Sequence, residues 1–144
     1  MKRYVMTVDL KDDPRGITDY RRHHRKIWPE VRDSLLRVGV VRMDIYQLER
    51  RLVMVMDTKD GFDLERGFAA HARSHPRCAE WEELMKTFQQ APPGAKPGGL
   101  WTPMEPLFHL ARGPHKARRR GGSGGAGEPP QLNSERGFTP RERR

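Results

Sequence analysis

The feature that most constrains the fold is a pair of β-rich runs, residues 40–48 and 52–57, joined by only three polar residues. The second run contains five consecutive apolar residues, Leu-Val-Met-Val-Met, as expected for a strongly buried strand. A connection as short as Glu49-Arg50-Arg51 permits only antiparallel pairing, because parallel neighbours need a crossover of a dozen or more residues. The two runs therefore predict a β-hairpin.

A helical stretch precedes this hairpin. Asp13 is a favourable N-cap, and Pro14 suits the first helical position, where its missing N–H costs nothing. Residues on one helical face then follow at spacings of three, four and seven: Ile17, Tyr20, His24, Ile27, Val31, Leu35 and Leu36. Pro29 removes a helical hydrogen bond, so we expect a kink or a restart near Trp28. Gly39 is expected to end the helix.

The remaining sequence patterns predict the other strands and a second helical region. Residues 4–10 predict a first strand, and residues 62–88 predict a second helical region with a break at His75-Pro76. Residues 101–110 are short and apolar but contain two prolines, which predicts a fourth strand at a sheet edge. The order β-α-β-β-α-β predicts an α+β fold, the ferredoxin-like sandwich.

The basic charge of the chain is concentrated at its C-terminal end. The net charge is +9, but residues 111–144 hold nine Lys and Arg against three Glu, and residues 1–110 carry only +3. Residues 111–144 also contain one aromatic residue, Phe138, and almost no aliphatic ones. We therefore predict a folded domain over residues 1–110 and a disordered basic Gly/Arg-rich tail over residues 111–144. A domain at +3 has no electrostatic footprint for nucleic acid, so no nucleic-acid partner is expected.

The chain has one cysteine, Cys78, so no disulfide can form within it, which fits a reducing cytosol. The apolar run after Met1 is too short for a signal sequence, and no stretch approaches the ~20 apolar residues of a membrane span. These features predict a cytoplasmic protein without a membrane segment.

The densest cluster of reactive side chains lies in residues 20–30. Tyr20 and His24 are one helical turn apart, and Trp28 follows on the same face if the helix persists. A phenol can donate a hydrogen bond to a sugar, an indole can cover its apolar face, and an imidazole can move a proton near neutral pH. His24 falls on the apolar face and His23 does not, although a solvated helix face is the alternative interpretation of this basic run.

A metal site is a second candidate in the second helical region. His71 and His75 are four residues apart, and Cys78 follows three later. Pro76 interrupts the helix between them, and no further ligand completes a zinc set at the usual spacing. Cys78 occupies an apolar helical position, where a cysteine is normally a small hydrophobe. Without a phosphate-binding loop or a nucleophile motif either, the sequence predicts no metal and no cofactor.

Residues 20–30 resemble the Y-x-x-x-H-x-x-I-W-P-E signature of the L-rhamnose mutarotase family. Further similar features are Cys78-x-x-Trp81-x-x-x-Met85 and Phe108-x-Leu110, so the resemblance covers residues 3–110. It implies a ferredoxin-like domain of dimeric α/β-barrel type, in which two copies pack sheet to sheet as a homodimer. It also implies an isomerase, a mutarotase that interconverts the α and β anomers of a free monosaccharide.

The resemblance assigns roles to particular positions. His24 matches the family's proton donor, and Tyr20 matches a substrate-contacting tyrosine. Trp81 matches the first of two adjacent sugar-contacting tryptophans, and Glu82 stands in place of the second. Met43 stands where the family has a further substrate-contacting tyrosine. Because both departures touch the sugar pocket, the resemblance supports the reaction type more strongly than the identity of the sugar.

The end of the domain, residues 101–110, is more similar to the L-fucose branch of this family than to the L-rhamnose branch. Two other functions share the fold: a non-catalytic dimeric ligand-binding module and a monooxygenase-like dimeric barrel. The set of Tyr20, His24 and Trp28 favours a mutarotase over both, and the resemblance implies a deoxy sugar such as L-fucose or L-rhamnose as its substrate.

Overall fold

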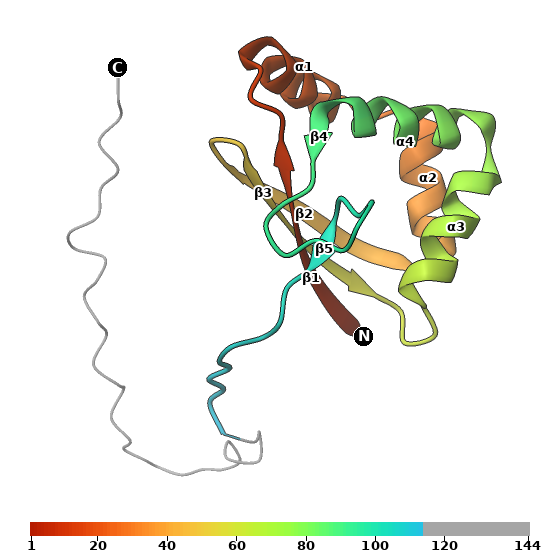
Figure 1. Ribbon diagram of the computed structural model, residues 1–144. Coiled ribbons are helices and arrows are strands. Elements are labelled where there is room, and N and C mark those ends of the chain that lie inside the picture. The colour runs from red at the N-terminus through yellow and green to blue at the C-terminus, as the bar shows by residue number, and fades with distance from the viewer. Residues whose placement is uncertain (114–144) are drawn as a thin grey trace. The chain divides into compact units, whose positions relative to one another are not determined.

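The computed structural model describes residues 1–113 and consists of an antiparallel sheet with helices gathered on one side of it (Figure 1). The elements in chain order are β1 Lys2–Leu10, α1 Pro14–Arg25, α2 Pro29–Val38, β2 Val40–Leu48, β3 Arg51–Thr58, α3 Leu64–Ser74, α4 Pro76–Phe88, β4 Gln89–Gln90 and β5 Thr102–Pro103. This arrangement confirms the predicted α+β, ferredoxin-like fold.

The hairpin predicted from the three-residue connection is present. The sheet order is β2-β3-β1-β4, and β5 also pairs with β1. β2 and β3 are antiparallel from Leu48 opposite Arg51 to Val40 opposite Thr58, with an irregularity between Val40 and Arg42. β3 also pairs along the full length of β1, so the apolar run of β3 lies in the middle of the sheet.

The helix boundaries follow local signals. The Asp13 side chain caps α1 by accepting a hydrogen bond from the Arg15 N–H at 3.2 Å. α1 then ends at Arg25 and α2 begins at Pro29, so of the expected kink or restart near Trp28 the structure shows the restart. Gly39 closes α2 with a positive φ of 120°, a conformation that glycine adopts at no steric cost. The second break is also confirmed, because α3 ends at Ser74 and α4 begins at Pro76.

The prediction of a fourth strand over residues 101–110 is wrong for most of its length. Only Thr102–Pro103 forms a strand, extended by one hydrogen bond from the Met104 N–H to the Val5 carbonyl at 2.9 Å. The other part of this edge of β1 pairs with Gln89–Gln90, which follows α4 directly. Proline has no N–H to donate to a ladder, so Pro103 contributes no N–H to this short pairing.

The core lies between the helices and the sheet. One cluster of buried side chains comprises Val8, Leu10, Tyr20, Val31, Leu52, Cys78, Trp81 and Met85, and a second comprises Met6, Val40, Met54, Met56 and Phe62. The compact unit that holds both clusters spans Met1–Glu105. From residue 114 onwards the predicted tail lies outside the described residues. None of the helices in residues 1–113 is long and apolar enough to cross a membrane.

Candidate functional site

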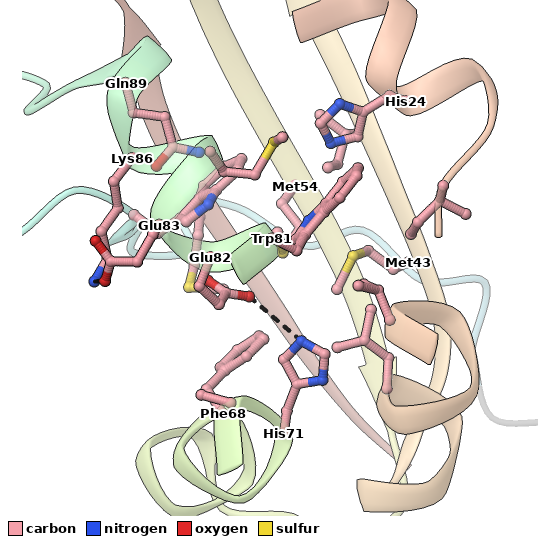
Figure 2. Close-up of a pocket in the computed structure, with 18 of the residues that line it drawn as sticks. His24, Met43, Met54, Phe68, His71, Trp81, Glu82, Glu83, Lys86 and Gln89 are labelled. Carbon is pink, nitrogen blue, oxygen red and sulfur yellow. Dashed lines mark hydrogen bonds and ion pairs between the residues drawn. The ribbon is translucent and has the colours of Figure 1, made fainter. Parts of the chain in front are cut away.

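A cavity of about 460 Å³ lies between the helices and the sheet, a size typical of small-molecule sites. α1 contributes Tyr20 and His24, β2 contributes Met43, and α4 contributes Trp81 and Glu82. Five of the six residues predicted from the sequence therefore line one cavity. Figure 2 shows His24 and the Glu82 side chain on either side of Trp81.

His24 is held in one tautomer by its own helix. Its Nδ1 lies 2.9 Å from the Tyr20 carbonyl oxygen, which can only accept, so Nδ1 carries the hydrogen and donates it. Nε2 then carries the lone pair of the neutral ring. Burial lowers the pKa of His24 below its ordinary value, the bond to the Tyr20 carbonyl opposes this, and the neighbouring His23 adds to the lowering. His24 is therefore a neutral imidazole base at pH 7.

Tyr20 is positioned as a hydrogen-bond donor. Its ring packs against the His24 imidazole with 4.3 Å between the ring centroids. Burial raises the pKa of Tyr20 to about 12, so the phenol keeps its proton at neutral pH. Its oxygen accepts a hydrogen bond from Gln89 Nε2 at 3.3 Å. The phenolic O–H remains to be donated to an oxygen of a ligand.

Trp81 supplies a buried aromatic wall. Its ring lies edge-on to the His24 ring, with 5.4 Å between their centroids, and edge-on to the Trp28 ring at 5.1 Å. Trp28 itself does not line the cavity, and its ring instead carries the Arg77 guanidinium 3.7 Å from its centroid. α1 stops at Arg25, so Trp28 is not carried onto the face that presents Tyr20 and His24. The aromatic group that the structure places beside these two residues is Trp81.

Sequence reasoning missed three residues at or beside the cavity: His71, Gln89 and Ser34. His71 and Gln89 line the cavity, and both are buried polar groups. Ser34 contacts the ring of His71, with 2.8 Å between Oγ and Nδ1. Only His71 carried a sequence signal, and that signal pointed to a metal.

The three residues considered for a metal site are separated in the structure. The His75 side chain caps α4, where Nδ1 accepts a hydrogen bond from the Arg77 N–H at 3.0 Å. Cys78 is completely buried among apolar side chains. Within residues 1–113, no group of three or more His, Cys, Asp or Glu side chains is arranged to hold a metal ion.

The fold and the cavity together define a class of protein: a small ferredoxin-like domain with a cavity of small-molecule size between its helices and its sheet. A sequence profile described as L-rhamnose mutarotase matches residues 3–110, and the chain belongs to this family. Mutarotases are carbohydrate isomerases, so the enzyme class predicted from the resemblance is confirmed.

Individual relatives agree with this assignment. The chain is 38% identical over 113 residues to the L-fucose mutarotase of Xanthomonas campestris pv. campestris, covering 77% of this chain and 90% of that protein. It is 26% identical over 114 residues to the L-rhamnose mutarotase of Jannaschia sp., covering 76% and 99%. Among solved structures, L-rhamnose mutarotase FA22100 from Formosa agariphila gives a TM-score of 0.56 at 19% identity, over 77% of this chain and all of that one. The last similarity concerns the fold.

Proposed function

We propose that this protein interconverts the α and β anomers of a deoxy sugar such as L-fucose or L-rhamnose, with His24 as the proton-transfer residue. The observation that carries the proposal is the neutral His24 imidazole at the wall of a sugar-sized cavity, with Nδ1 bound to the Tyr20 carbonyl. The relationship to an L-fucose mutarotase at 38% identity supports the choice of sugar.

The chemistry of mutarotation fits these groups. The anomeric hydroxyl loses its proton while the ring oxygen gains one, the bond between C1 and the ring oxygen breaks, and an open-chain aldehyde forms. Rotation about the C1–C2 bond and the reverse proton transfers close the ring with the opposite configuration. His24 Nε2 takes the hydroxyl proton, and water or a second group protonates the ring oxygen. General acid–base catalysis of this kind contributes ~10²–10⁴-fold.

The other side chains of the cavity would hold the sugar in place. The Tyr20 O–H donates to a sugar oxygen, and the Trp81 ring covers an apolar face of the ring. Met43 and Met54 from the sheet add an apolar surface that suits the methyl group of a deoxy sugar.

Polarimetry tests the proposal. A pure anomer of L-fucose or L-rhamnose is dissolved, and its optical rotation is followed to equilibrium with and without the protein. We expect the relaxation rate to rise in proportion to protein concentration for at least one of the two sugars. Unchanged relaxation for both, in samples where the sugar binds, would favour the non-catalytic binding module.

The rate of anomer exchange should depend on pH through His24. Protonation removes the base, and burial lowers its pKa below the ordinary 6.5. We therefore expect the rate to fall on the acid side through a single titration whose midpoint lies below 6.5. The protein-catalysed rate is measured as a function of pH after subtraction of the buffer-catalysed rate. A midpoint above 6.5 would contradict the assignment of this base.

We also propose that the protein is a homodimer that buries the face of the sheet opposite the helices. Val5 and Val55 face each other across β1 and β3 on this side, and Val53 lies beside them. On β2, Tyr46 and Leu48 are 61% and 75% exposed. Apolar surface of this kind is typical of an interface between subunits, and a twofold arrangement would cover both copies at once.

Light scattering at micromolar protein is expected to give the mass of a dimer. Val55→Lys places a charge in the centre of the proposed interface and should shift the mass towards a monomer, because an unpaired charge is costly to bury. Thr18→Lys on the exposed side of α1 is the matched control and should leave the mass unchanged. A monomer mass for the unmodified protein would refute the dimer.

A further inference from the structure

His71 is a buried polar side chain that the proposed mechanism does not use. It lies on α3, is 1% exposed and lines the same cavity as His24 (Figure 2). Its Nε2 is buried and has no hydrogen-bond partner within residues 1–113. Buried polar atoms are normally paired, so an unpaired nitrogen at a cavity wall indicates a contact that a ligand would supply.

A ring of hydrogen bonds determines which nitrogen of His71 carries the hydrogen. Ser74 Oγ donates to the His71 carbonyl oxygen at 2.8 Å, a better acceptor than Cys78 Sγ at 3.6 Å. The single hydroxyl hydrogen of Ser74 is then used, so Ser34 Oγ donates to Ser74 Oγ at 2.6 Å. Ser34 in turn accepts from His71 Nδ1 at 2.8 Å. Nδ1 therefore carries a hydrogen, and in the neutral form of the ring Nε2 is an acceptor.

This tautomer places two acceptors side by side. His71 Nε2 lies 3.4 Å from Glu82 Oε1, and Figure 2 marks this contact. Lys86 on the same helix lies 3.3 Å from the Glu83 carboxylate, where it has a partner of its own. The Glu82 side chain is 40% exposed, so a ligand in the cavity can reach it. Two adjacent lone-pair acceptors repel each other until two donors are provided.

We propose that His71 Nε2 and the Glu82 carboxylate form a subsite for two neighbouring hydroxyl groups of the sugar. A vicinal diol presents two O–H donors about as far apart as these acceptors, one for the nitrogen and one for the carboxylate. This inference rests on the proposed function, because it takes the cavity to hold a sugar with its anomeric carbon at His24. His24 and Glu82 lie on either side of Trp81. A sugar with its anomeric carbon at His24 would therefore direct the far side of its own ring, with the hydroxyls on C3 and C4, towards the subsite.

The subsite would discriminate against sugars that lack one of the two neighbouring hydroxyl groups. A sugar without one of the two hydroxyls leaves an acceptor unpaired, and the loss is most costly at His71 Nε2, which is buried and has no other partner among the described residues. The apolar methionines of the sheet offer no substitute donor. Glu82 stands in place of a tryptophan in the family pattern. Its carboxylate would accept hydrogen bonds from hydroxyl groups, whereas an indole would only cover them.

The test compares L-fucose with its 3-deoxy and 4-deoxy analogues by NMR titration. We expect at least one analogue to bind the unmodified protein about tenfold more weakly than L-fucose, the effect of one unpaired buried acceptor. Glu82→Gln should weaken L-fucose binding by a similar factor. It should leave nearly unchanged the affinity for the analogue that lacks the hydroxyl bound by Glu82. Glu80→Gln is the control, because the Glu80 carboxylate pairs with Arg77 and does not line the cavity.

The ¹⁵N signals of His71 provide a second measurement. In the free protein we expect the Nδ1–H tautomer, and added L-fucose should shift the Nε2 signal as it accepts a hydrogen bond. Equal affinity for all three sugars, or an imidazolium at His71 that L-fucose does not affect, would overturn the subsite. In that case continuing anomer exchange would leave the proposed function standing, whereas failure of these three sugars and of L-rhamnose to bind would contradict both.

Discussion

His24→Asn is expected to lower the rate of protein-catalysed anomer exchange by about 10²-fold or more, while sugar binding changes little. Asparagine keeps an N–H donor close to the Tyr20 carbonyl, which holds His24 Nδ1 at 2.9 Å. It has no group that accepts a proton near neutral pH, so the base is removed with little change to the cavity wall. The rate is measured by polarimetry at saturating sugar, so that a change in affinity does not affect the measured rate.

His23→Asn is the matched control for this variant. The His23 ring lies near Trp81 and Phe88, at 6.2 and 5.9 Å between centroids, but it does not line the cavity. We expect its exchange rate to stay close to that of the unmodified protein. An undiminished rate in His24→Asn, on a sugar that binds, would exclude His24 as the proton-transfer residue.

Gly67→Ala is expected to destabilise the fold by about 1–3 kcal/mol, the usual cost of overpacking a core. A Cβ atom at Gly67 would lie 2.2 Å from Cε2 and 2.5 Å from Cζ of Phe62. The Phe62 ring is buried and packs against Tyr4 and Phe68, so it has little room to move. Alanine normally stabilises a helix by about 1 kcal/mol relative to glycine, so a net loss reports the collision with Phe62.

Thermal unfolding followed by circular dichroism measures this effect, and the midpoint should fall by roughly 5–15 °C. Gly61→Ala is the control, because a Cβ at Gly61 meets nothing within 4 Å. Its midpoint should match that of the unmodified protein. A midpoint for Gly67→Ala equal to or above the unmodified one would show that the packing of Phe62 on α3 is looser than described.

The elements that depend on local signals were predictable from the sequence. The connection Glu49-Arg50-Arg51 is too short for anything but a hairpin, and the Asp13-Pro14 pair specifies a helix start through its own side chains. The edge of the sheet was not predictable. Gln89–Gln90 forms a strand because α4 delivers it to the end of β1, although glutamine does not favour strands. Which segment of the chain pairs with that edge of β1 depends on the tertiary structure.

The functional site was likewise predictable only where local sequence signals determine it. Tyr20 and His24 are one turn apart on a single helix, so their spacing alone brings them together. Trp28 lies outside the cavity because Pro29 starts a new helix, the restart that this proline indicates in the sequence. His71 and Ser34 come from α3 and α2, and their pairing depends on how those helices pack. A lone buried histidine leaves no periodic signal that distinguishes a sugar contact from a metal ligand.

Saturation-transfer NMR on L-fucose at equilibrium distinguishes catalysis of anomer exchange at the His24 cavity from binding alone. Irradiating the α anomeric proton measures its exchange with the β form, and broadening of the sugar signals in the same sample reports binding. We expect transfer to the β proton to grow in proportion to protein concentration and to be lost in His24→Asn, while the broadening persists. Broadened signals without any transfer in the unmodified protein would rule out catalysis and identify a protein that binds the sugar without converting it.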